Sequence, residues 1–189
     1  NMYYDREVFP YKVRYLERST NRALAEDTVG TGYYGEEKTF YAKIIDNYEL
    51  INEEPQVMTI RQENGSDPVI NVLIFYYKIE QALFKYIPVG GGTVSLETER
   101  VAVNGLAEGS TPVADNGYRF IGWYMDANCT IPVTTQGSIN GSTQHLDPLK
   151  QDGRYISTTY YALFQQETTT ITVSKTVTGN TGNKDKQFE

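Results

Sequence analysis

Three segments carry apolar side chains at consecutive positions, and they restrict the possible folds more than any other feature of this chain. They are "VINVLIFYYKI" (Val69 to Ile79), "YRFIGWYMD" (Tyr118 to Asp126) and "YYALF" (Tyr160 to Phe164). Each segment is short and apolar in both phases of a two-residue repeat, which is typical of a strand covered on both faces. We therefore predict that these segments form central strands of small sheets.

Shorter segments predict further strands around the central ones. In "YKVRYLE" (Tyr11 to Glu17) apolar and charged residues alternate, as in a half-buried strand. "YELIN" and "QVMTIRQ" have a similar character, and "ENGSD" supplies an Asn-Gly turn signal. Sixteen Tyr and seven Phe add to the strand-forming composition.

Two segments favour helical structure. Phe40, Ile44 and Ile45 have helical spacing after acidic residues, so the sequence predicts a short helix from Lys38 to Ile45. A helical turn is expected at Glu108 to Ala114. The predicted fold class is therefore α+β, dominated by strands, with one short helix in each unit.

The only tryptophan, Trp123, lies in the middle of an aromatic cluster. In a regular strand, Ile121 and Met125 share its face, and Phe120 and Tyr124 share the other. Burying an indole removes about 150–250 Å² from water, which is a large contribution for a small domain. A ligand platform is the alternative. We expect a structural core, whose members are Trp123, Phe120, Tyr161 and Leu163.

The charge and the reactive side chains argue against several classes of function. The net charge of −7 and a pI near 4.8 disfavour binding to nucleic acid or to an anionic membrane surface. No apolar stretch reaches the roughly 20 residues of a membrane span. The only histidine, His145, cannot build a His-rich metal site, and the only cysteine, Cys129, has no basic neighbour to activate it. We therefore expect a protein that has no enzymatic activity and binds no metal or cofactor.

Two acidic pairs are candidates for catalytic carboxylates. Glu36 and Glu37, and likewise Glu53 and Glu54, are adjacent in sequence. Neighbouring residues on a strand point to opposite faces, whereas a glycosidase needs two carboxylates that face each other across a cleft. Solvated turns are the expected setting of these four side chains.

An internal echo predicts modules arranged in series. "MYYDREVFPYKVRY" (Met2 to Tyr15) and "FYYKIEQALFKY" (Phe75 to Tyr86) each join the end of one strand to an aromatic-rich new strand. Modules in series are typical of stalks. We expect a fragment of a longer protein, with residues 1–9 as the end of an upstream module or linker.

Lys175 occupies the apolar phase of "TITVSKTVT", together with Ile171, Val173 and Val177. Burial of an ammonium group lowers its pKa and favours the nucleophilic neutral amine. Beside an Asn carboxamide and a proton-shuttling carboxylate, such a lysine could form an amide cross-link with loss of ammonia. An edge-strand lysine that reaches solvent is the alternative.

Three resemblances to known families follow from these segments. Residues 10–80, with "YKVRYLE", "YGEEKTFYAKI", "YEL" and the Tyr-rich "LIFYYKI", resemble the mucin-binding-protein-like repeat of Gram-positive surface proteins. Residues 81–166 are similar to the internalin B-repeat, or Listeria–Bacteroides repeat, through "GYRFIGWYMDANCTIPV" and "YYALF". Residues 167–189, with "ITVSKTVTGNTG", resemble a linker and the first strand of a streptococcal-pilin-type isopeptide domain.

The resemblances imply an extracellular adhesin of a Gram-positive bacterium, attached covalently to the cell wall through a C-terminal part that is missing here. They imply two tandem β-grasp-like modules and an isopeptide-forming role for Lys175. The expected function is a non-enzymatic stalk that spaces or presents a binding region. Direct binding of host mucin, glycan or extracellular protein is the alternative, with Tyr33 and Tyr34 in a Gly-flanked loop as candidate contacts.

Overall fold

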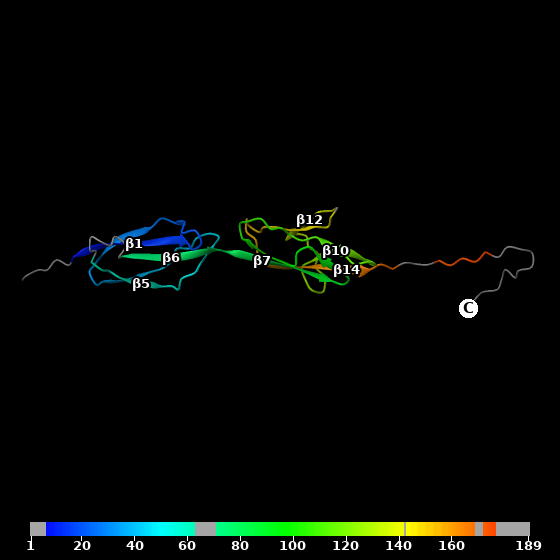
Figure 1. The fold of residues 1–189 in the computed structure, drawn as a ribbon, viewed down its shortest axis with the longest axis horizontal. Helices are drawn as coiled ribbons and strands as arrows, with labels where there is room; N and C mark the ends of the chain where they lie inside the picture. Colours follow the sequence, from blue (N-terminus) through cyan, green and yellow to red (C-terminus); the bar gives the residue numbers. More distant parts are fainter. Residues whose placement is uncertain (1–6, 63–70, 142, 169–171, 177–189) are drawn as a thin grey trace, which may run out of the picture.

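The computed structural model describes residues 7–62, 71–141, 143–168 and 172–176. It consists of two small β modules arranged end to end (Figure 1). We call Val8–Ile79 the first module and Gln81–Gln166 the second module. Each is built on a four-stranded mixed sheet with two-stranded ribbons beside it.

The first module has its first and last strands in the middle of the sheet. The strand order is β2-β1-β6-β4, in which β1 and β6 are parallel and both edge strands are antiparallel to their neighbours. A separate ribbon pairs β3 with β5. The strands are β1 (Val8–Glu17), β2 (Thr28–Tyr33), β3 (Glu37–Phe40), β4 (Tyr48–Leu50), β5 (Gln56–Thr59) and β6 (Val72–Ile79).

The second module repeats this topology. Its order, β11-β14-β7-β9, again places the first and last strands side by side and parallel in the centre. Two ribbons, β8–β10 and β12–β13, accompany the sheet. The strands are β7 (Gln81–Val89), β8 (Gly92–Val94), β9 (Thr98–Ala102), β10 (Pro112–Ala114), β11 (Tyr118–Tyr124), β12 (Gly137–Ile139), β13 (Leu146–Pro148) and β14 (Thr158–Gln166).

The predicted α+β class is wrong, because the described residues contain strands and no helix. At the first expected helix, Glu37–Phe40 forms β3 and pairs with β5. The ring of Phe40 lies 5.2 Å from that of Tyr11, while Ile44 is fully exposed. Cross-strand pairing and the contact with Tyr11 therefore prevail over a helical spacing that would have buried Ile44 as well.

The helical turn expected at Glu108 to Ala114 is also absent. The carboxylate of Glu99 accepts hydrogen bonds from the backbone N–H groups of Glu108 (2.9 Å) and Gly109 (3.1 Å). Gly109 has a φ of 75°, in the left-handed region, and a Cβ there would lie 2.2 Å from the Leu146 carbonyl oxygen. These contacts hold the segment extended, and Pro112–Ala114 continues as β10.

Each module has its own hydrophobic core, and the two clusters of buried residues share no member. In the first, Phe75 is completely buried and stacks on Tyr15 with ring centroids 6.0 Å apart. In the second, Trp123 is 1% exposed and meets Tyr86 edge to face at 6.0 Å. The Trp123 Nε1–H donates a 2.9 Å hydrogen bond to the Gln144 carbonyl.

A β-bulge changes which side chains of β11 share a face. The register against β14 shifts between Phe120 and Gly122, so Ile121 is an extra residue. Phe120 and Trp123 consequently contact each other at 5.9 Å, instead of lying on opposite faces as a regular strand would place them. Phe120 is only partly buried, against the same core as Trp123.

The face of β14 that lies in the core carries Tyr160, Ala162 and Phe164. Tyr161 and Leu163, which the sequence analysis places in the core, lie on the opposite, half-buried face. Both phases of this strand are apolar, so alternation alone could not distinguish the two faces.

Candidate functional site

The junction between the modules is a single residue, Glu80, between the last residue of β6 and the first of β7. Its N–H donates a 2.9 Å hydrogen bond to the Asn47 carbonyl in the first module. Its carbonyl accepts a 3.0 Å hydrogen bond from the Val103 N–H in the second. Glu80 is therefore held on both sides, and the chain passes from one sheet to the next without a flexible linker (Figure 1).

Arg154 adds a side-chain contact across this junction. It lies in a turn of the second module, and its guanidinium forms an ion pair with the Glu80 carboxylate. Its other terminal nitrogen lies 3.9 Å from the Asp46 carboxylate of the first module. Such partly exposed pairs contribute about 0–1 kcal/mol, so this contact orients the modules more than it stabilises them.

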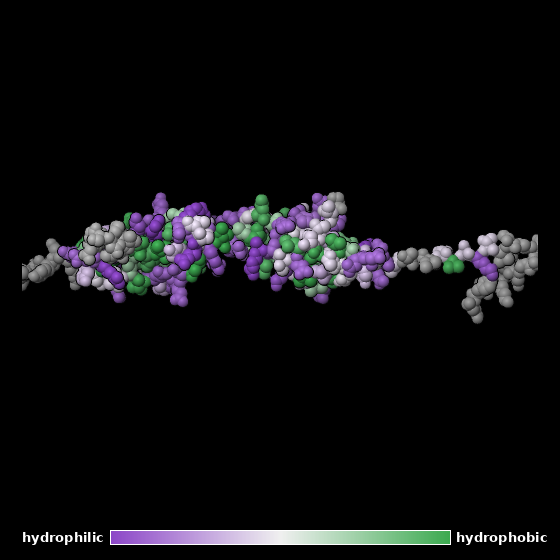
Figure 2. Space-filling view, in the orientation of Figure 1, coloured by the Kyte–Doolittle hydropathy of each residue, from purple (hydrophilic) through white to green (hydrophobic). Residues whose placement is uncertain are grey.

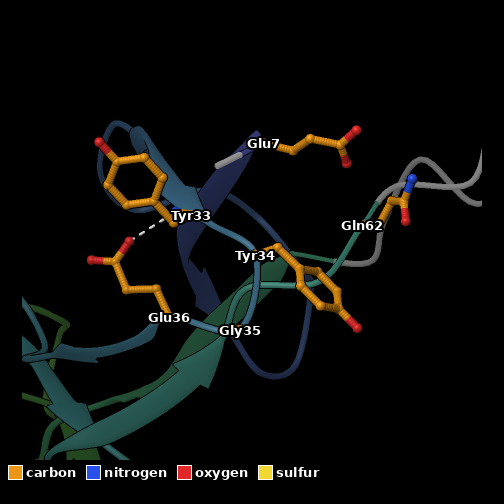
Figure 3. A pocket seen from close by; sticks show the side chains of 6 residues that line it. All are labelled: Glu7, Tyr33, Tyr34, Gly35, Glu36 and Gln62. Carbon is orange, nitrogen blue, oxygen red and sulfur yellow. Dashed lines mark hydrogen bonds between the residues drawn. The ribbon is translucent and has the colours of Figure 1, made fainter. Parts of the chain in front are cut away.

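A surface hollow lies beside Tyr33 and Tyr34 in the first module (Figure 3). It encloses about 770 Å³ and opens widely to solvent. Tyr33 ends β2 with 48% of its surface exposed, and Tyr34 begins the following turn with 66% exposed. The lining residues are Glu7, Tyr33, Tyr34, Gly35, Glu36 and Gln62.

The two tyrosine rings do not form a joint platform. Figure 3 shows them projecting to opposite sides of the backbone. The Tyr34 ring packs edge to face against Phe9, with centroids 6.5 Å apart. A ligand in the hollow would contact Tyr34 from one side, and stacking between both rings is excluded by their directions.

Carboxylates determine the charge of this hollow. Glu36 forms an ion pair with Lys38 at 2.9 Å and accepts a 2.8 Å hydrogen bond from the Tyr33 N–H. The Lys38 contact, followed by the Tyr33 N–H, lowers the pKa of Glu36 and keeps it ionised. Glu7 also lines the hollow. A neutral ligand with hydroxyl donors suits this lining better than an anion does.

The residues considered for catalysis have structural contacts. Burial raises the pKa of the Cys129 thiol, and the nearby Asp126 carboxylate raises it further. His145 lies between Thr111, 2.7 Å from its Nδ1, and Asp147, 3.3 Å from its Nε2. Glu54 accepts a hydrogen bond from the Ala42 N–H at 2.8 Å. Within the described part of the chain, no group of His, Cys, Asp and Glu side chains could hold a metal ion.

The carboxylate of Asp126 stabilises the loop that follows Trp123. One carboxylate oxygen accepts the N–H groups of Thr130 (2.9 Å) and Ile131 (2.7 Å), and the other accepts the Thr130 hydroxyl (2.9 Å). These bonds, with that of Ile131 first, lower the pKa of Asp126. Beyond the loop, the Val133 N–H donates to the Trp123 carbonyl at 2.9 Å. The segment is thus a closed hairpin over the core.

Lys175 lies in an irregular segment, residues 172–176, and is exposed. The strand predicted around it is not seen at these residues, and Ile171 and Val177 lie outside the described residues. The described segments contain no helix with the length and hydropathy needed to cross a membrane. Figure 2 shows hydrophilic and hydrophobic side chains interspersed over both modules.

No protein-family model and no curated protein matches this chain. The three resemblances therefore stay predictions, and a proposal about function depends on the geometry of the two modules. Sequence reasoning missed Glu80 and Arg154, which make the junction. The internal echo around "YKIEQALFKY" includes Glu80, but no pattern links Arg154 to a glutamate 74 residues earlier.

Proposed function

We propose that this chain is a non-enzymatic spacer of a bacterial cell-surface protein, which holds a binding region away from the cell wall. The observation that carries this proposal is the repeated topology. In both modules the first and last strands are central and parallel. The chain therefore enters each module at one end and leaves it at the other, so modules add length instead of folding back.

The register gives the length of each step. Lys12 lies beside Val72 and Thr158 beside Phe84. From Val8 to Ile79, and from Gln81 to Gln166, the path along the sheet covers about eleven strand residues, or about 36 Å per module at about 3.3 Å per residue. Two modules thus span about 70 Å with a one-residue joint. The cell-wall location and the adhesin class come from the sequence resemblances and are part of this proposal.

Length and stiffness can be tested together by small-angle X-ray scattering and surface display. The chain is displayed on a Gram-positive cell wall with an epitope at its free end. We expect antibody access to exceed that of a Gly-Ser linker of about 50 residues, whose mean end-to-end distance is about 40 Å, because the two modules span about 70 Å. The matched variant carries a flexible Gly-Ser insertion between Ile79 and Gln81, which should shorten the mean extension. Equal access and equal dimensions for the chain and the linker would contradict the spacer function.

Glycan or mucin recognition is the second candidate, favoured by the exposed Tyr34 ring beside an open hollow of about 770 Å³. Aromatic rings with adjacent carboxylates are suited to sugar hydroxyls and apolar sugar faces. A glycan array probed with the chain, the Tyr33→Ala/Tyr34→Ala double variant and Tyr41→Ala as control tests it. Tyr41 is 66% exposed and does not line the hollow. Saturable binding lost only in the double variant supports recognition, and absence of saturable binding refutes it.

The cross-linking role of Lys175 is part of the same proposal for a longer protein. Its amine would join an Asn carboxamide of the same pilin-type domain, forming an amide with release of ammonia. The cross-linked protein has an intact mass that is lower by one ammonia than the mass calculated from its sequence. The Lys175→Arg variant should have the full mass calculated from its own sequence. A mass of the natural protein equal to the value calculated from its own sequence, with no ammonia lost, would exclude the bond.

A further inference from the structure

We infer that each module is a mechanical clamp, in which tension applied through the chain ends is borne as shear between its two central parallel strands. The inference deepens the proposed spacer function and rests on it for its biological meaning. The mechanical property itself follows from the strand register and can be measured on the isolated chain.

The load path in the first module runs through β1 and β6. Tension enters at the start of β1, near Val8, and leaves at the end of β6, at Ile79. The two strands are parallel and paired over six positions, from Lys12–Val72 to Glu17–Tyr77. Pulling the start of one strand against the end of its parallel neighbour makes the strands slide along each other. All cross-strand hydrogen bonds are then loaded together.

The second module presents the same geometry to the same force. Tension enters β7 at Gln81 and leaves β14 at Gln166, and these strands pair in parallel from Thr158–Phe84 to Leu163–Val89. Glu80 passes the force between modules along one extended segment (Figure 1). Both clamps are therefore in series, with strands aligned along the pulling direction.

Further bonds continue the first clamp beyond its paired positions. The Lys12 N–H donates to the Asn71 carbonyl at 2.9 Å, and the Arg18 N–H donates to the Tyr77 carbonyl at 2.8 Å. The Asn71 side chain is 2% exposed and donates to the Pro10 carbonyl at 3.1 Å. A buried amide that ties β1 to the residue before β6 resists the first sliding step, because its hydrogen bond to Pro10 must break as β1 moves.

Shear and peeling differ in how many bonds must break at once. In shear the whole ladder breaks in one step, whereas in peeling the pairs open one after another. Forced unfolding is governed by the barrier to unfolding and not by the equilibrium stability. One module with one set of contacts should consequently resist force strongly along its ends and weakly across its central strands.

The experiment is single-molecule force spectroscopy of the same protein in two pulling geometries. In the first, handles are attached to the chain ends. In the second, they are attached through Gln81→Cys and Ile156→Cys in a Cys129→Ser background. Both new cysteines are exposed and lie at the same end of β7 and β14, so this geometry peels the strands apart. Trp123 fluorescence during urea unfolding verifies that the variant keeps its second core.

The end-to-end geometry should show two unfolding steps whose sizes identify the modules. For the first module, about 70 residues at about 3.5 Å each, less a folded span of about 35 Å, give a step of about 210 Å. The second module, with about 85 residues, should give about 265 Å. The force that unfolds the second module should be several-fold higher when it is pulled from the chain ends than when it is pulled across the two cysteines.

Equal unfolding forces in both geometries at the same loading rate would overturn the clamp. Gradual extension from the chain ends without two steps would overturn it too. Neither result would touch the spacer function, which depends on the length and stiffness measured without load. Conversely, a chain that is short or flexible in scattering could still resist shear, so the two ideas fail separately.

Discussion

Replacing Phe75 with alanine should strongly destabilise the first module and leave the stability of the second module nearly unchanged. Phe75 is completely buried, stacks on Tyr15 and belongs to a core that shares no residue with the core around Trp123. The contacts between modules described above are few and lie at the junction. A loss of stability in one core should therefore stay largely within its own module.

The magnitude follows from the size of the core change. A buried Phe→Ala change costs about 3–5 kcal/mol, because it removes apolar contacts and leaves a cavity. A module of about 70 residues has a total stability of about 4–10 kcal/mol. With a urea slope of about 1 kcal/mol/M for so small a unit, the midpoint of the first module should fall by about 3–5 M.

The assay uses the position of the only tryptophan. Trp123 lies in the second core, so its fluorescence reports the second module alone, while far-UV circular dichroism reports both. In Phe75→Ala, the dichroism transition should split and its early part should move to low urea. The fluorescence midpoint should move by less than about 1 M, since the ion pair at the junction is worth about 0–1 kcal/mol.

A fluorescence midpoint that falls together with the dichroism transition would refute the reasoning, because the two modules would then form one cooperative unit. Val29→Ala is the matched control. Val29 lies on β2 in the same module and is 67% exposed, so its truncation should leave both transitions unchanged. A large effect of Val29→Ala would mean that the dichroism change does not report on the core.

Three further predictions concern hydrogen bonds and the junction. Burial raises the pKa of Tyr77 and of Tyr160 to about 12. The phenol of an unfolded tyrosine titrates at about 10. The contribution of these two neutral phenols to stability is therefore complete below that pH and is lost as the pH rises toward about 12. Tyr77→Phe should weaken the pH dependence of stability, measured as alkaline unfolding by circular dichroism. Asn71→Ala should cost about 1–3 kcal/mol in urea unfolding, because the side chain of Asn71 is 2% exposed and three backbone groups of Pro10 and Arg61 lose a partner. Arg154→Ala should change the free energy of unfolding by less than about 1 kcal/mol, but it should broaden the distribution of distances between spin labels on the two modules. Glu80→Asp keeps the carboxylate, so its distance distribution should be narrower than that of Arg154→Ala. Unchanged distributions would contradict an orienting role.

The strand content was open to prediction because alternation and aromatic content are local signals. "VLIFYYKI" and "YYALF" are predicted as central strands, and β6 and β14 lie in the centre of their sheets. The same prediction is wrong for "YRFIGWYMD", because β11 lies at the edge of its sheet. The parallel partner of β6 could not be predicted, since Lys12 and Val72 are 60 residues apart and no local pattern specifies pairing over that distance. The strand pairing on which the proposed function depends is thus non-local.

The errors arose where two structures satisfied the same local pattern. The spacing of Phe40, Ile44 and Ile45 fits a helix, but pairing with β5 used Phe40 and left Ile44 in solvent. In β14 both phases are apolar, so Tyr161 and Leu163 were chosen where the core uses the alternate residues. A bulge of one residue in β11 cannot be read from alternation, because it reverses the phase without changing composition.

The relative direction of the first and last strands of a module explains why a single residue can join the two modules. If the first and last strands of a module were antiparallel, the chain would return to its entry end, and a following module would need a long linker or would lie alongside. With parallel terminal strands, the last strand of one sheet already points along the axis, so β7 can begin one residue after β6 ends. Parallel pairing requires a long crossover, and in both modules the ribbons and loops occupy that crossover. A spacer of the kind proposed would need only the central strands and the joint to keep their geometry. Crossover segments such as the turn at residues 33–36 could then acquire binding contacts without shortening the array.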